Sequence, residues 1–141
     1  MTLVVVDASI VVKWFLPEES SDAARQLLDE SSELVAPDLV FAEAGNAVWR
    51  RVRMRQLEAP IARRLVADIA GIALQPIPSR FLLKDAIGVA ISAGITVYDA
   101  LYLVLAVRLG TQLVTADARL SAAVSGRPQL RDHIRLVSAG A

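Results

Sequence analysis

Two acidic residues of this 141-residue chain stand at or just beyond the ends of short segments that are expected to be strands. Asp7 follows residues 3–6, a β-branched run, and Asp117 follows residues 112–115. Both runs are expected to be strands, and parallel sheets bind their ligands at the carboxyl ends of strands. Each Asp also suits the N-cap of the helix expected after it, because a short carboxylate can accept bonds from free N–H groups. Either residue alone thus has a structural explanation, whereas the two together indicate a site.

Glu43 and Asp99 are acids in apolar surroundings. Glu43 lies on an expected helix over 38–55, with Asp38 as its N-cap, and it falls inside the apolar stripe of that helix. Asp99 is the only acid of an expected helix over 97–109 that is apolar almost all round. A buried charge needs a cation, an arginine or a proton. The structural alternatives are a salt bridge from Glu43 to an arginine and a capping box that pairs Thr96 with Asp99.

Four carboxylates that converge would repel one another and would require a cation. The chain has no cysteine and a single histidine, His133, which excludes thiolate ligands, zinc sites built on a histidine pair, and thiol catalysis. Hard oxygen ligands select Mg²⁺ or Mn²⁺ rather than zinc. The sequence therefore predicts an oxygen-ligated divalent metal site.

The elements that would position these acids alternate along the chain. Strands are expected over 3–6, 34–36, 73–77, 112–115 and 134–137. Helices are expected over 8–16, 20–31, 38–55, 59–71, 79–93, 97–109 and 118–124. This alternation implies right-handed crossovers and a central, mainly parallel sheet with helices on both faces. With no repeat and no long linker, the prediction is a single α/β domain over residues 1–141.

Composition restricts the class of protein further. Fifteen basic residues balance fifteen acidic ones, which argues against a generic, field-driven binder of nucleic acid or of anionic membranes. The apolar fraction of 55% excludes disorder and suggests a surface that a partner covers. The longest apolar run, 100–107, is too short to span a membrane, and no basic region precedes the first apolar run. We therefore expect a cytoplasmic protein.

Arginines are unevenly distributed along the chain. Six of the fifteen basic residues fall between positions 50 and 64: Arg50, Arg51, Arg53, Arg55, Arg63 and Arg64. Arginine suits bidentate contacts with phosphate, although such a run is also typical of a solvated helix face or of ion pairs to a partner. Lys13 and Trp14 follow Asp7 closely, so they could flank its site, and Trp14 could stack on a base.

Four segments carry a resemblance to a known family. They are Val6-Asp7-Ala8-Ser9, Pro37-Asp38-Leu39 continuing to Glu43, Tyr98-Asp99-Ala100-Leu101-Tyr102, and Thr115-Ala116-Asp117-Ala118-Arg119-Leu120. In order and spacing they resemble the signature blocks of PIN-domain ribonucleases, in particular the VapC-type toxins of bacterial toxin–antitoxin pairs. The resemblance implies a single PIN-like domain in which Asp7, Glu43, Asp99 and Asp117 are catalytic and bind the metal. Ser9, Thr115 and Asn46 match polar positions that often accompany this cluster.

The resemblance also implies an activity and partners. The activity would be Mg²⁺-dependent endoribonuclease cleavage by a toxin, leaving 5′-phosphate and 3′-hydroxyl ends, with Glu43 or Asp117 orienting the attacking water. The partners would be the RNA substrate, a second copy of the chain, and a cognate VapB-like antitoxin whose C-terminal segment lies in an apolar groove. Trp14, Phe15, Leu16 and Trp49 are candidates for the covered surfaces, and core packing is the simpler expectation for each.

Two other functions fit parts of the pattern. A phosphatase or phosphotransferase could use Asp7 as its nucleophile, but Ser9 stands where a second Asp is usual, and only Lys13 and Lys84 could supply the required lysine. A non-catalytic, Mg²⁺-binding receiver or interaction module would need a lysine near the end of the chain, and the last third has none.

Overall fold

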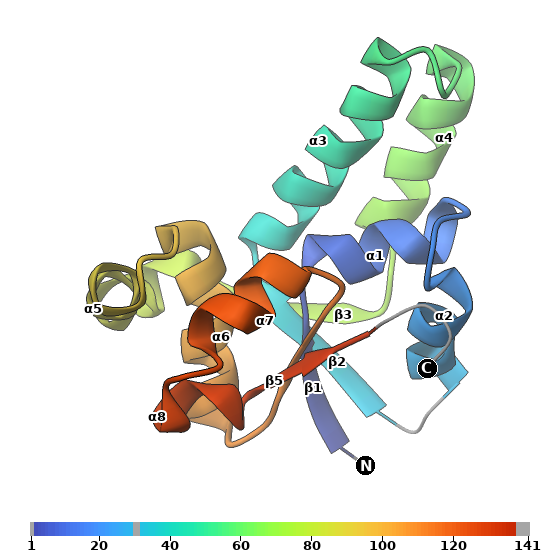
Figure 1. Ribbon diagram of the computed structural model, residues 1–141. Helices are drawn as coiled ribbons and strands as arrows, with labels where there is room; N and C mark the ends of the chain where they lie inside the picture. The colour runs from blue at the N-terminus through green and yellow to red at the C-terminus, as the bar shows by residue number, and fades with distance from the viewer. Residues whose placement is uncertain (1, 30–31, 138–141) are drawn as a thin grey trace.

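The computed structural model describes residues 2–29 and 32–137, and its centre is a parallel sheet (Figure 1). Five strands pair in the order β3-β2-β1-β4-β5. Their bounds are Thr2–Val6 for β1, Ser32–Pro37 for β2, Leu74–Ile77 for β3, Leu113–Thr115 for β4 and Ile134–Leu136 for β5. The register places Val4 beside Leu34 and Val6 beside Val114. All five expected strands are confirmed, together with their parallel pairing.

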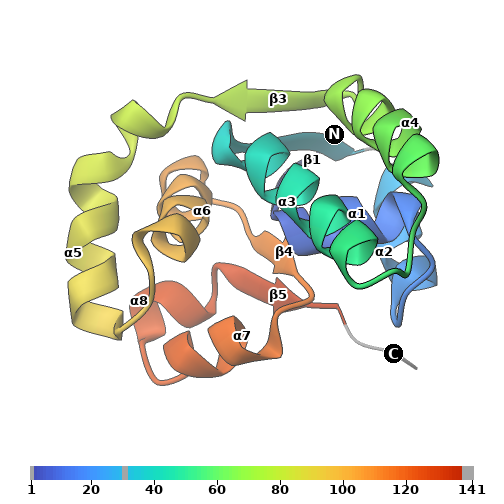
Figure 2. The ribbon, with the colours of Figure 1, turned by 90° about the horizontal axis from the view of Figure 1, so that it is seen from above.

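Eight helices cover the sheet within the described residues. The first four are α1 (Ala8–Phe15), α2 (Ser21–Asp29), α3 (Leu39–Arg53) and α4 (Ala59–Ala70). After the 3₁₀ turn η1 (Ser79–Phe81) come α5 (Leu83–Ala93), α6 (Val97–Leu109), α7 (Ala118–Val124) and α8 (Pro128–Arg131). Figure 2 shows α1 to α4 on one side of the sheet and α5 to α8 on the other. Because the strand order reverses direction after β3, right-handed crossovers require this division.

The helices differ from expectation in three details. The helix expected over 79–93 begins as the 3₁₀ turn η1, and the short helix α8 was not predicted. The helix expected over 20–31 is α2, whose described part ends at Asp29, and positions 30 and 31 lie outside the described residues. None of these details moves an element that carries one of the four acids.

The hydrophobic core lies on both faces of the central strands and holds the sheet between the two layers of helices. Val5 and Val6 are fully buried, as expected for a central parallel strand that is covered on both faces. α6 is buried from Ala100 to Ala106 and packs against β1 and β2. The carboxyl ends of the strands therefore point toward a common edge, above which the α3–α4 pair projects (Figure 1).

Asp38 does not act as the predicted side-chain cap of α3. The residue itself adopts helical angles (φ −59°, ψ −18°), and its carboxylate makes no bond to the first turn. Instead Asp38 Oδ1 accepts bonds from the backbone N–H of Ser79 (3.2 Å) and from the Ser79 hydroxyl (2.5 Å). This acid thus ties the start of α3 to the start of η1.

In the described part of the chain, no single helix combines the length and the hydropathy needed to cross a membrane. Helices α5 and α6 have the required length and hydropathy only when they are counted as one segment, and the angle between them is 114°.

Candidate active site

One large cleft, of about 910 Å³, opens at the carboxyl ends of the central strands. All four predicted acids line it: Asp7 after β1, Glu43 on α3, Asp99 in the first turn of α6, and Asp117 after β4. Ser9 and Asn46 line the same cleft. Segments that are far apart in the sequence therefore bring four carboxylates to one cavity.

Asp7 is the most buried of the four acids, with 8% of its surface exposed. Its Oδ1 caps α1 by accepting bonds from the N–H groups of Ser9 (3.1 Å) and Ile10 (3.3 Å), so the predicted cap is confirmed. The Ser9 hydroxyl donates to the same oxygen (2.5 Å), and the Thr115 hydroxyl donates to Oδ2. The two hydroxyls expected beside the site thus hold both oxygens of this carboxylate.

Burial raises the pKa of Asp7 to about 6, although the bonds from Ser9, Thr115 and Ile10 oppose that rise. The charge of Asp99 raises the pKa further. A carboxylate with this pKa pays a free-energy cost for its charge near neutral pH, because the low-dielectric surroundings disfavour the ionised form. A bound cation would remove much of that cost.

Asp99 and Asp117 both occupy first-turn positions and still line the cleft. Asp117 Oδ1 accepts bonds from the N–H groups of Arg119 (3.0 Å) and Leu120 (3.1 Å), which confirms it as the N-cap of α7. At α6 the Thr96 hydroxyl accepts the bond from the Asp99 N–H (3.1 Å), so the cap does not depend on the Asp99 carboxylate. Burial and the nearby charge of Asp117 raise the pKa of Asp99, with Thr96 and Arg119 opposing.

Glu43 has a partner that the sequence analysis did not identify. The structural alternative, a salt bridge from Glu43 to an arginine, is not found among the described residues; instead, the Tyr102 hydroxyl donates to Glu43 Oε1 (2.6 Å). Burial raises the pKa of Glu43, the Tyr102 bond lowers it, and the charge of Asp99 raises it. Tyr102 is almost fully buried. The sequence could have indicated Tyr102 as a residue of the site. A buried tyrosine hydroxyl usually has a hydrogen-bond partner, and Tyr102 follows Asp99 by three residues on α6, so the two share a helix face.

The four acids supply carboxylate oxygens, the type of ligand that a hard divalent cation prefers. Over residues 2–29 and 32–137, none of the four acids takes part in a salt bridge, so their charges meet no internal cation at bonding distance. Within the same residues, no three acidic or histidine side chains stand close enough together to hold an ion as arranged. The four carboxylates thus line one cleft, but they are not close enough together for three of them to contact a single ion in this arrangement.

The arginine-rich stretch divides among several surfaces. Arg50 and Arg51 line the cleft, as does Lys13, which confirms that Lys13 flanks the site. Arg53 lies over the ring of Trp49, 5.6 Å from its centroid. Arg63 lines a second, smaller hollow between α3 and α4. Only part of the stretch therefore faces the acids.

The tryptophans have opposite environments. Trp14 is buried and its Nε1 donates to the carbonyl of Ala24 (2.8 Å), so it belongs to the core and cannot stack on a base. Trp49 is 52% exposed, which contradicts the expectation of core packing. It lines the α3–α4 hollow, of about 210 Å³, together with Val48, Val52 and Val66.

Comparison with known proteins agrees with this geometry. The family model for the PIN domain matches residues 4–125, a span that contains all four acids. Ribonuclease VapC3 of Pyrobaculum aerophilum is 34% identical over 119 residues, which cover 83% of this chain and 91% of the relative. Ribonuclease VapC1 of Mycobacterium tuberculosis is 32% identical over 133 residues, which cover 94% of this chain and 96% of the relative.

The fold is also found in a solved complex. VapBC2 from Rickettsia felis, bound to a DNA fragment from their promoter, matches with a TM-score of 0.63. The match covers 96% of this chain and 98% of that chain at 17% identity, so it shows a common fold. The PIN match favours the nuclease prediction over both the phosphatase and the receiver alternatives.

Proposed function

This chain belongs to the PIN-domain family, in its VapC group, and from that premise we propose that it is a metal-dependent endoribonuclease acting as the toxin of a toxin–antitoxin pair. The observation that carries the proposal is the meeting of Asp7, Glu43, Asp99 and Asp117 in one cleft. The names of both relatives, each a ribonuclease, support the substrate class.

We propose Mg²⁺ as the cofactor, with Mn²⁺ as a substitute, held by Asp7 and Asp99 with help from Glu43 and Asp117. A cation of this type supplies charge to polarise a phosphate and to lower the pKa of a bound water. Asp7 is locked by Ser9 and Thr115, which keeps both of its oxygens in place. Such prior positioning reduces the cost of organising the site for each reaction.

Glu43 and Asp117 are the candidates for orienting the attacking water. Glu43 uses Oε1 for Tyr102, and Asp117 uses Oδ1 for the cap of α7, so each keeps a second oxygen for the cleft. In-line attack on the phosphodiester would leave a 5′-phosphate and a 3′-hydroxyl. No histidine is needed in this scheme, and His133 lies outside the cleft, with Nδ1 2.8 Å from the Thr111 carbonyl.

Cleavage of labelled RNA tests the proposal. Purified protein should cut RNA with Mg²⁺ present and should stop when EDTA is added, and 5′-end mapping should find phosphates. Asp7→Asn and Asp99→Asn should each reduce the rate by at least about 100-fold, because each removes charge from the site that stabilises the transition state. Asp68→Asn, an exposed change outside the cleft, is the matched control. Folded Asp7→Asn protein with undiminished activity would reject the assignment.

The proposed partners use two apolar surfaces. A VapB-like antitoxin is proposed to place its C-terminal segment in the apolar hollow beside Trp49. The Rickettsia felis match is to a VapBC complex, which supports an antitoxin as the kind of partner. A second copy of the chain is proposed to cover α5, where Leu83, Ile87 and Ile91 form an exposed stripe at helical spacing. Action on cellular RNA would place the protein in the cytoplasm.

A further inference from the structure

The cleft has a basic end beyond the four acids. Along α3, the residues lining the cleft include Glu43, Asn46 and Arg50, which follow one another at steps of three or four and so share one helix face. Arg50 lies seven positions after Glu43 on α3, a rise of about 10 Å along the helix. That distance corresponds to about three stacked nucleotides of one strand. The distance along the cleft from the acids to the basic residues therefore matches the length of a short RNA segment.

Charge at this end is only partly balanced. Lys13 and Arg51 pair with one carboxylate, Glu18, and Arg50 lines the same cleft. Glu18 Oε2 lies 3.5 Å from Lys13 Nζ, and Glu18 Oε1 lies 3.1 Å from an Arg51 guanidinium nitrogen. Among residues 2–29 and 32–137, Arg50 makes no ion pair. The cations thus exceed the carboxylate by two.

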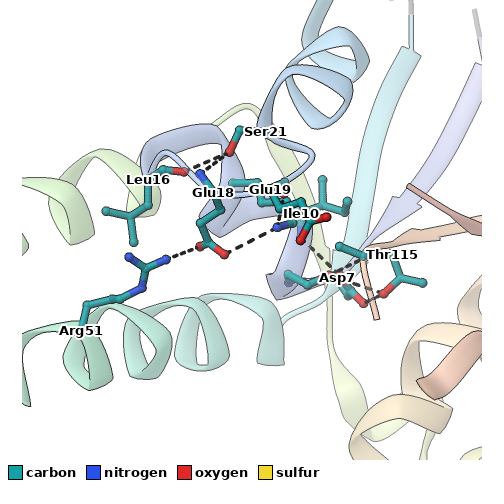
Figure 3. A network of polar contacts seen from close by, with 11 residues as sticks. Asp7, Ile10, Leu16, Glu18, Glu19, Ser21, Arg51 and Thr115 are labelled. Atoms are coloured by element: carbon teal, nitrogen blue, oxygen red, sulfur yellow. Dashed lines mark hydrogen bonds and ion pairs between the residues drawn. The ribbon is translucent and has the colours of Figure 1, made fainter. Parts of the chain in front are cut away.

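Figure 3 shows the side chain of Glu18 extending from the turn between α1 and α2 toward Arg51 on α3. The turn holds Glu18 in place, because its backbone N–H donates to Ser21 Oγ (2.8 Å) and that hydroxyl donates to the Leu16 carbonyl (3.1 Å). Lys13 is 8% exposed, and its Nζ also donates to the Glu19 carbonyl (2.6 Å). A buried ammonium and a guanidinium are therefore arranged around one anion, which is also the arrangement that binds phosphate.

We propose that Lys13, Arg50 and Arg51 form a subsite for a backbone phosphate of RNA, a few nucleotides from the cleaved bond. In the absence of RNA, Glu18 stays paired with Lys13 and Arg51, and the RNA phosphate displaces it. This inference rests on the proposed function, because it requires RNA to run along the cleft. Two cations in excess of the local carboxylate attract the polyanion despite a net charge of zero. Glu18 in turn limits how strongly the resting site binds other anions.

Fluorescence anisotropy with a labelled oligouridine of about 12 nucleotides tests the subsite, at several salt concentrations and in EDTA so that no cleavage occurs. Arg50→Gln should weaken binding about three- to tenfold and reduce the salt slope by about 0.7, the loss of one phosphate contact on a single strand. Arg51→Gln should do the same. Glu18→Gln should tighten binding severalfold, since it frees Lys13 and Arg51. Arg131→Gln, an exposed arginine on α8, is the matched control and should leave binding unchanged.

Each contrary result has a distinct meaning. If Glu18→Gln weakens RNA binding, or if Arg50→Gln and Arg51→Gln bind like wild type, the subsite is refuted. Arg50 is exposed, so its variant is expected to fold and remains informative if Glu18→Gln does not. If the arginine variants lose antitoxin affinity but keep RNA affinity, the basic end binds protein and the subsite is again refuted. Wild-type cleavage in the same preparation separates these outcomes from failure of the proposed function, in which wild type neither binds nor cuts RNA.

Discussion

At the residue scale, Asp7 combines a structural role with a place in the cleft. It caps α1 and accepts hydroxyl bonds from Ser9 and Thr115, yet it lines the same cavity as three other acids. The alternatives of cap and ligand, which compete when only the sequence is considered, are compatible because a carboxylate has two oxygens with several acceptor positions. Asp117 repeats this combination at the start of α7.

The raised pKa of Asp7 predicts how stability depends on pH in metal-free protein. Because the folded-state pKa, about 6, exceeds 3.8, the ordinary value for an aspartate, the contribution of Asp7 is fully present below about pH 4 and is lost as pH rises through 6. The total loss is on the order of 3 kcal/mol. Asp7→Asn removes this titration and should become more stable relative to wild type as pH rises from 4 to 7. Denaturant unfolding in EDTA measures the difference, and a difference that stays constant with pH would contradict the burial argument.

At the element scale, α3 contributes residues to the cleft, to the core and to the hollow against α4, each from a different face of the helix. Glu43 and Arg50 line the cleft, Val40 and Val48 are buried in the core, and Trp49 lines the hollow against α4. Apolar periodicity predicted the helix and placed Glu43 near the core. It could not predict that Trp49 would be exposed, because that depends on where α4 packs. Nor could it predict the hydrogen bond from Tyr102 on α6 to Glu43 on α3, because these two residues are 59 positions apart in the chain.

The exposed Trp49 leads to a prediction about the antitoxin. Trp49→Ala should weaken the affinity for the cognate antitoxin at least about tenfold, because a tryptophan at the centre of an interface commonly contributes strongly to binding. RNA cleavage by the free protein should be unchanged, since Trp49 does not line the main cleft. Isothermal titration calorimetry measures the affinity. Phe81→Ala, another exposed aromatic residue, is the control, and equal affinities for all three proteins would remove the hollow as the binding site.

At the scale of the whole molecule, zero net charge hides a separation of charge. Four acids and the three cations Lys13, Arg50 and Arg51 line one cleft, and Arg50 lies about two helical turns beyond Glu43 along α3. Strand alternation and the four sequence blocks were sufficient to predict the parallel sheet and to select four acids that line one cleft at its edge. The division of the arginines among cleft, tryptophan and hollow follows from helix packing, which local sequence does not encode.

The apolar stripe on α5 predicts the oligomeric state. Ile91 is 76% exposed and continues the line of Leu83 and Ile87, so a second copy covering it would account for apolar surface left open in one chain. Ile91→Glu should convert a dimer into a folded monomer, because the interface would bury an unpaired charge. Sedimentation equilibrium measures the mass. Leu28→Glu, at an exposed position on α2, should remain dimeric, and an unchanged mass for Ile91→Glu would place the interface elsewhere.

The central claim is that the four carboxylates act together as one cation site, and direct measurement of metal binding tests it without reference to RNA. Titration of Mn²⁺, followed by calorimetry or electron paramagnetic resonance, should give clear binding to wild type. Affinity should fall at least about tenfold in Asp7→Asn and in Asp99→Asn, and measurably in Glu43→Gln and Asp117→Asn, since each loses a charged oxygen ligand. Asp68→Asn should match wild type. If folded Asp7→Asn and Asp99→Asn bind Mn²⁺ as tightly as wild type, the cluster is not the metal site and the proposed chemistry is wrong.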